Sequence, residues 1–111
     1  TAPAFPGDPQ YPYVGKLVHD LTAAQLRTLD CGKLLAGFPD AEVVAGNRIA
    51  TLSEVFALTD SYGADVRYNI ETKIEAANPE QSAPPEQFVD VILDAVRQAG
   101  KIDSVEIQSF D

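Results

Sequence analysis

Several residue types are rare or missing in this chain of 111 residues, and each shortage limits what the chain can be. Methionine and tryptophan are absent, and the single cysteine excludes a disulfide within the chain. No apolar run approaches the roughly 20 residues that cross a bilayer, so we expect no membrane span. The length, with 45% hydrophobic and 23% charged residues, is typical of one soluble globular domain.

Positive charge is also scarce, because 8 Lys and Arg residues stand against 17 Asp and Glu and leave a net charge of -9. Nucleic-acid binders and proteins that dock on anionic membranes need basic surfaces, so we expect neither kind of partner. An acidic chain is compatible with metal binding. A signal peptide removed before Thr1 would fit the way the chain starts, which slightly favours a secreted or periplasmic location over a cytoplasmic one.

Proline is concentrated at the start of the chain. Four of the eight prolines fall in the first twelve residues, at Pro3, Pro6, Pro9 and Pro12. Such spacing is typical of an extended segment without regular structure. We therefore expect residues 1–16 to form a loop or arm and residues 17–111 to form the folded segment.

Three helices are predicted from capping signals and terminal glycines. Two start where a threonine is followed three residues later by Gln or Glu, the pattern of a capping box. The third starts at a proline pair followed by an acid, which suits a first helical turn. The predicted helices start at Thr22, Thr51 and Pro84 and end before Gly32, Gly63 and Gly100.

Two strands are predicted, at residues 65–74 and 104–110. The order helix, strand, helix, strand is typical of βαβ units in a parallel sheet. Two strands and three helices make a poor closed core, because a parallel sheet needs both faces covered. We therefore interpret the chain as an α/β segment of a larger protein.

The strand at 65–74 departs from the continuous apolar pattern of a buried parallel strand. Alternation puts Val66, Tyr68 and Ile70 on one face and Arg67, Asn69, Glu71 and Lys73 on the other. Burying the polar face is costly unless it meets partners, a metal or water. Two interpretations stay open, namely a functional cluster and a strand with one wet face or at a sheet edge. The strand at 104–110 alternates more weakly, and a half-exposed strand explains it.

Four segments of the chain carry recognisable motifs. Residues 20–32 contain D-L-T and L-D-C-G, and residues 48–55 read R-I-A-T-L-S-E-V. Residues 69–73 read N-I-E-T-K, and residues 105–111 read V-E-I-Q-S-F-D. In this order they resemble motifs of the glycerophosphodiester phosphodiesterase family, with Ala50 in place of a usual proline. Together they cover most of the chain.

The resemblance implies a fold, an activity and a set of site residues. The implied fold is a partial (β/α)8 TIM barrel, of which this chain would supply about two βα units. The implied activity of the intact protein is metal-dependent hydrolysis of glycerophosphodiesters to glycerol 3-phosphate and an alcohol. Glu71 would be one of three carboxylates that hold a divalent cation, Mg or Ca, since both prefer oxygen ligands. Lys73 would bind the phosphate, and Asn69 and Gln108 would complete the pocket wall.

Other family motifs are missing from this chain. They are H-R-G, E-x-D and H-D, which supply two catalytic histidines and two metal carboxylates. The only histidine, His19, directly precedes a helix start, so we interpret it as an exposed or loop histidine. Cys31 has no partner at metal or triad spacing and is interpreted as a packed thiol, and Asp90 and Asp94 as a solvated helix face.

The segment alone should therefore be inactive and contain no catalytic residue. The enzyme hypothesis, a phosphoric diester hydrolase, applies to the intact protein. The alternative hypothesis is a truncated, non-catalytic binding or interaction module derived from the same fold. Under either hypothesis the fold needs the rest of the barrel or self-association to be complete.

Overall fold

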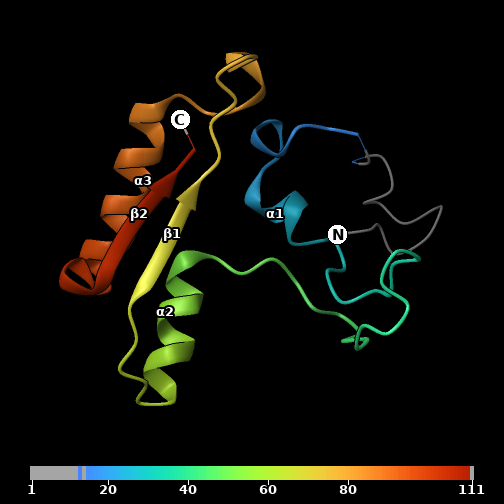
Figure 1. The fold of residues 1–111 in the computed structure, drawn as a ribbon, viewed down its shortest axis with the longest axis horizontal. Coiled ribbons are helices and arrows are strands. Elements are labelled where there is room, and N and C mark those ends of the chain that lie inside the picture. Colours follow the sequence, from blue (N-terminus) through green and yellow to red (C-terminus); the bar gives the residue numbers. More distant parts are fainter. Residues whose placement is uncertain (1–12, 14, 111) are drawn as a thin grey trace. The chain divides into compact units, whose positions relative to one another are not determined.

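The computed structural model describes residues 13 and 15–110, and it divides into two compact units, Thr1–Ala50 and Thr51–Asp111 (Figure 1). Most of the predicted arm at residues 1–16 lies outside the described residues. Its irregular structure, and the domain boundary at residue 17, therefore stay predictions.

The first unit has little regular structure. A 3-10 helix, η2 (Val18–Asp20), precedes the single-turn helix α1 (Ala23–Leu26). The Thr22 hydroxyl accepts the Gln25 N–H at 3.2 Å, and the Gln25 side chain accepts the Thr22 N–H at 2.8 Å, so the predicted capping box is confirmed. The Thr28 hydroxyl donates to the Gln25 carbonyl, which a longer helix would use for its own backbone bond.

One carboxylate helps to close the loop after α1, together with backbone hydrogen bonds such as that from the Cys31 N–H to the Asn47 carbonyl. Asp30 accepts the N–H of Gly32 at 2.9 Å and the N–H of Gly46 at 3.3 Å. The hydrogen bond from Gly32 contributes most to holding the pKa of Asp30 below its ordinary value of 3.8. A side chain at Gly32 has no room, because its Cβ would stand 1.7 Å from the Val44 carbonyl oxygen.

The second unit follows the predicted order of helix, strand, helix and strand. Its elements are α2 (Leu52–Ser61), β1 (Tyr68–Thr72), η3 (Pro79–Gln81), α3 (Pro85–Gln98), η4 (Ile102–Ser104) and β2 (Val105–Ser109). Both strands are shorter than predicted, because pairing in register extends over five residues of each.

The helix ends of this unit also follow the sequence. Thr51 and Glu54 form the predicted capping box at the start of α2. Gly63 after α2 and Gly100 after α3 have positive φ angles of 62° and 67°, which glycine adopts without strain. The residue after each glycine donates to a carbonyl in the last helical turn, as in a Schellman motif.

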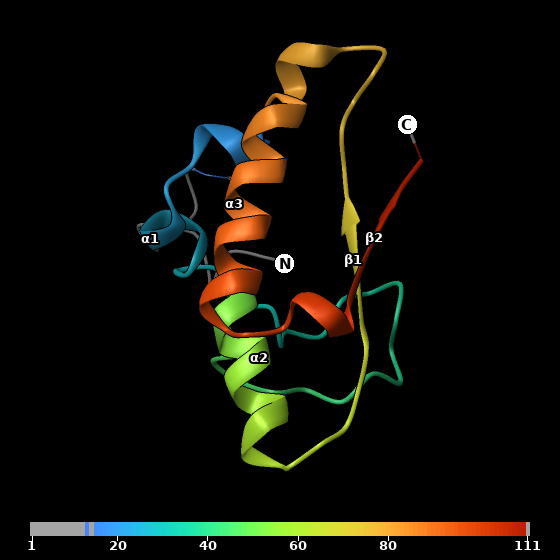
Figure 2. The ribbon, with the colours of Figure 1, turned by 90° about the vertical axis from the view of Figure 1, so that its left-hand side faces the viewer.

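β1 and β2 pair in parallel, with Tyr68 opposite Val105 and Thr72 opposite Ser109. Both α2 and α3 lie on the same side of the two strands (Figure 2). The Phe56 ring of α2 meets the Tyr68 ring edge-on at 4.9 Å, and the hydroxyls of Thr59 and Tyr68 are 2.5 Å apart. The opposite face of the sheet carries the polar residues of the alternating pattern.

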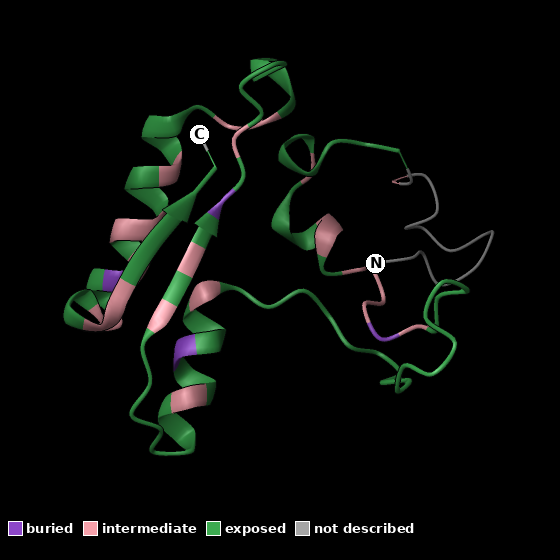
Figure 3. Ribbon diagram, viewed as in Figure 1, coloured by how far each residue is buried: buried purple, intermediate pink, exposed green. Residues whose placement is uncertain are grey.

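The core of the second unit is small. Among the described residues, Phe56 and Val96 are the buried hydrophobic side chains, and Phe56 is 1% exposed. Most of the coloured ribbon belongs to the exposed class (Figure 3). Lys101 supports this core from its edge, because its ammonium pairs with Asp60 of α2 and lies 5.9 Å from the centre of the Tyr68 ring. The hydrogen bond to Asp60 raises the pKa of Lys101 above its ordinary value of 10.5.

The predicted TIM-barrel architecture is wrong for this structure. A barrel needs strands that close on themselves and an outer ring of helices. The described residues instead form a two-stranded sheet whose helices cover one face, and five-residue strands in a single pair cannot close. The coarser prediction is confirmed, since this part of the chain is a mixed α/β segment with three α-helices and a parallel sheet.

Candidate functional site

The four predicted site residues share the sheet face that α2 and α3 do not cover. Alternation along β1 places Asn69 and Glu71 on this face, and the register places Gln108 of β2 beside Glu71. Lys73 follows β1 and continues the alternation. All four are exposed. We call this set, with Arg67 and Glu106, the polar face.

Side chains of the polar face bind one another across the strands. The Asn69 amide donates to the Gln108 amide oxygen at 2.6 Å. Two residues before each of these in the chain, the Arg67 guanidinium pairs with the Glu106 carboxylate, with 2.9 Å between nitrogen and oxygen. These contacts hold Asn69 and Gln108 as a unit that can present further donors and acceptors to a ligand.

The end of the polar face carries a carboxylate and an ammonium in contact. The Lys73 Nζ lies 2.5 Å from Oε1 of Glu71 and 5.6 Å from the centre of the Phe110 ring. The Glu71 side chain is 33% exposed and the Lys73 side chain 74% exposed, so both can be reached by a ligand. An exposed pair of this kind is weak, typically below about 1 kcal/mol.

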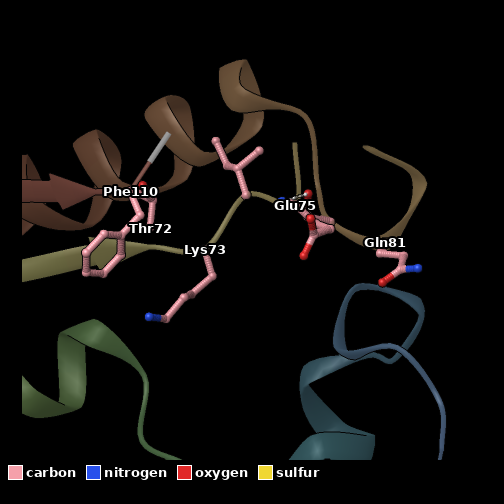
Figure 4. A pocket seen from close by; sticks show the side chains of 7 residues that line it. Thr72, Lys73, Glu75, Gln81 and Phe110 are labelled. Carbon is pink, nitrogen blue, oxygen red and sulfur yellow. Dashed lines mark hydrogen bonds between the residues drawn. The ribbon is translucent and has the colours of Figure 1, made fainter. Parts of the chain in front are cut away.

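A polar pocket of about 280 Å³ opens where the two strands end (Figure 4). It is lined by Thr72, Lys73, Ile74, Glu75, Gln81, Ser82 and Phe110. Its wall is fixed by two hydrogen bonds, from the Glu75 N–H to the Ser82 hydroxyl at 3.1 Å and from the Ala77 N–H to the Glu75 carboxylate at 3.2 Å.

Lys73 is the one lining residue that the sequence predicts as a site residue. Sequence reasoning missed the other six, among them Glu75, Gln81 and Phe110. The available signal was position, because loops that follow parallel strands lie at the carboxyl edge of the sheet, where ligands bind in open α/β folds.

The fit of a divalent cation can be judged from the donor set. Glu71 offers carboxylate oxygens, which Mg²⁺ and Ca²⁺ prefer, on an exposed face. Within the described residues, however, no three His, Cys, Asp or Glu side chains gather into a group that could hold a metal. Glu71 therefore fits as one contributor to a cation site and not as the whole of it.

The residues set aside on sequence grounds lie away from the polar face in the chain. His19 is exposed in η2, with Nδ1 at 3.4 Å from the Asp20 carboxylate. Cys31 is half-buried, and its thiol lies 3.9 Å from the Leu29 carbonyl oxygen. Asp90 and Asp94 are exposed on α3, in line with a solvated helix face.

A second cavity lies between α3 and the strands. It has a volume of about 350 Å³ and an apolar wall that includes Val89, Leu93 and Ile107. Ile107 of β2 faces the helix layer and is still 56% exposed. We call this cavity the apolar groove.

Comparison with known proteins adds no relative: no family model, curated protein or solved structure matches the chain. No helix in residues 13 and 15–110 has the length and apolar character needed to cross a bilayer.

Proposed function

We propose that these residues take part in the metal-dependent hydrolysis of glycerophosphodiesters to glycerol 3-phosphate and an alcohol, as part of a phosphoric diester hydrolase. The observation that carries the proposal is the meeting of Glu71, Lys73, Asn69 and Gln108 on one sheet face, beside a polar pocket. These residues come from the two strands whose motifs resemble the phosphodiesterase family.

Each side chain has a role that suits its chemistry. The Lys73 ammonium binds a phosphoryl oxygen as a compact positive charge at the edge of the pocket. The bonded amides of Asn69 and Gln108 donate to the oxygens of the glycerol or phosphate group. Glu71 holds a divalent cation, Mg or Ca, together with carboxylates from other parts of the protein. When bound, the cation neutralises charge on the phosphate.

The proton transfers of the reaction need other groups. Hydrolysis breaks a P–O bond to the alcohol, so a base must take a proton from water and an acid must protonate the leaving oxygen. His19 is the one histidine of the chain and directly precedes a helix start, unlike the catalytic histidines that the resemblance implies, so we assign it neither role. The 111 residues alone should therefore bind the substrate but not hydrolyse it.

The first test compares two glutamates of the polar face in a longer protein that contains these residues and the missing motifs. We expect Glu71→Gln to abolish release of glycerol 3-phosphate from glycerophosphocholine in the presence of Mg²⁺ or Ca²⁺. Glu106→Gln makes the same charge change on the same face, where the side chain pairs with Arg67, and should keep most of the activity. Wild-type turnover by Glu71→Gln would refute the role of Glu71.

The second test uses the 111-residue chain itself. Titration with glycerol 3-phosphate, followed by amide NMR shifts, should perturb residues around Lys73 and the pocket. Lys73→Met should remove that response, whereas Arg67→Met, which also deletes a cation from the polar face, should leave it in place. Equal responses in both variants would count against Lys73 as the phosphate-binding residue.

A second candidate function is a non-catalytic module that associates with a second copy of itself, and the exposed Ile107 in the apolar groove favours it. If β2 pairs antiparallel with its copy about Ile107, Glu106 lies opposite Gln108, so like charges do not face each other. The net charge of -9 opposes association, so dimers should increase with salt. A monomer at both 50 mM and 500 mM NaCl in sedimentation equilibrium would exclude this function.

A further inference from the structure

The apolar groove leaves large apolar side chains in contact with water. Val89 of α3, Ile102 of η4 and Ile107 of β2 line the groove and are 54%, 53% and 56% exposed. α2 lies against α3 but contributes no residue to the wall. Apolar side chains that stay exposed along one concave surface mark a place where another molecule binds.

The rim of the groove is mainly acidic. Glu86 and Asp90 of α3 each stand three residues before a residue of the groove wall, and Asp103 directly follows another. All three are exposed, and none has an ion-pair partner within the part of the chain that the structure describes. Of the nearby cations, Arg97 is exposed on α3, and Lys101 is already paired with α2. The rim therefore has an excess of negative charge that a basic partner can compensate.

We propose that the apolar groove binds an amphipathic helix of a partner protein, in which basic residues flank an apolar stripe. α2 provides the model for this packing, because it lies against α3 while its Phe56 ring contacts Tyr68 of β1. The partner helix would lie against the other flank of α3, with apolar residues at i, i+3, i+4 and i+7 on Val89 and Ile107. The inference is independent of the proposed hydrolysis, since it uses the sheet face opposite the polar face.

Two other occupants fit the charges less well. A second copy of the chain would bring two acidic rims together, each on a chain with a net charge of -9. An extended peptide could add a strand to the edge of β2 that faces away from β1, but it would lie in the plane of the sheet. Glu86 and Asp90 lie on α3, in the helix layer. A basic helix beside α3 brings its flanking Lys or Arg residues next to both carboxylates.

The test titrates the isotope-labelled 111-residue chain with three blocked synthetic peptides as probes, followed by amide NMR shifts. The first, KLKKLLKKLLKLLK, has the length of α3 and places its leucines on one helix face. The second has the same residues in strict alternation, and the third has Glu in place of every Lys. We expect the first to shift the amides of Val89 and Ile107 and to bind about tenfold or more tightly than either of the others.

Matched valine substitutions on α3 locate the binding surface. Val89→Ser should weaken binding of the first peptide about three- to fivefold, because the apolar side chain that the peptide covers is lost. Val91→Ser changes a valine of the same helix that is 59% exposed and lies outside the groove wall, so it should have no effect. Equal effects of the two substitutions would overturn the groove as the binding surface. Dimerisation of the free chain that Val89→Ser abolishes would overturn the partner helix in favour of a second copy.

Paired substitutions test the acidic rim. Glu86→Gln together with Asp90→Asn should weaken binding of the first peptide about two- to fivefold. Asp40→Asn together with Glu42→Gln removes the same charges from exposed residues of the first unit and should leave the affinity unchanged. Equal affinity for the alternating peptide would overturn the helical partner, and equal affinity for the acidic peptide would overturn the charge match. Absence of shifts with all three peptides would overturn the proposal as a whole.

Discussion

The second unit should depend unusually strongly on one side chain, Phe56. It is 1% exposed, and its ring meets Tyr68 at 4.9 Å, which joins α2 to β1. Replacing a buried phenylalanine by alanine costs about 3–5 kcal/mol, and the small size of this core favours the lower end because neighbours can relax. At about 0.05–0.15 kcal/mol per residue, a unit of this length has only about 3–9 kcal/mol of stability. We therefore expect Phe56→Ala to remove about 3 kcal/mol and to leave the unit close to unfolding.

Urea denaturation of the 111-residue chain, followed by circular dichroism, measures this loss. Phe56→Leu keeps a large apolar group and loses the ring contact, so it should cost about 0.5–1.5 kcal/mol and stay measurable if the alanine variant does not fold. Tyr62→Ala is the matched control, because Tyr62 is an aromatic residue at the end of the same helix that is 80% exposed. A Phe56→Ala loss below about 1 kcal/mol, or equal losses at Phe56 and Tyr62, would refute the reasoning.

Three further predictions concern caps and charges. Thr51→Ala should destabilise α2 by about 1 kcal/mol in urea denaturation, while Thr51→Ser, which keeps the capping hydroxyl, should cost little. The pKa of Asp30 is lowered, so its contribution to stability is present above the ordinary value of 3.8 and is lost as the pH falls through the lower folded value; the Gly32 amide proton should titrate in NMR with a midpoint below 3.8. The pKa of Lys101 is raised, so its pairing with Asp60 stabilises the fold below the ordinary value of 10.5 and is lost as the pH rises through the higher folded value. In urea denaturation the wild type should therefore be more stable than Asp60→Asn at pH 8, and this difference in stability should disappear once the pH exceeds the folded pKa of Lys101.

Local signals were sufficient to predict where the helices start and where α2 and α3 end, whereas α1 ends at Leu26, well before the predicted stop at Gly32. Capping boxes and helix-ending glycines act within a few residues, so their outcome depends little on distant parts of the chain. Thr22 and Thr51 cap the helices that they were expected to cap, and Gly63 and Gly100 follow the helices that they were expected to end. The polar alternation of β1 was predicted in the same way, because side-chain period fixes which residues share a face.

Predictions that depend on distant pairing were less successful. The length of a strand depends on how many of its residues pair with a neighbouring strand, and β1 and β2 pair over only five residues. The prediction of a barrel rested on the family resemblance, and a barrel requires strands and helices that the described residues do not form. Phe110 was missed for the same reason, since its contact with Lys73 arises only when the ends of β1 and β2 are brought together.

The exposure of the polar face changes the argument for a functional site. From the sequence alone, four polar residues on one strand face suggested either chemistry or a wet face, because burial would otherwise be costly. In the structure this face is exposed, so its polarity needs no ligand to offset a burial cost. What still distinguishes the site is the position of particular groups. Arg67 and Glu106 form an ordinary surface ion pair along the strands, whereas Glu71 and Lys73 meet at the strand ends beside a pocket and an aromatic ring. A wet face alone predicts that Glu71 and Glu106 are equivalent, and a catalytic face predicts that only Glu71 matters, so the paired glutamine substitutions separate the two interpretations.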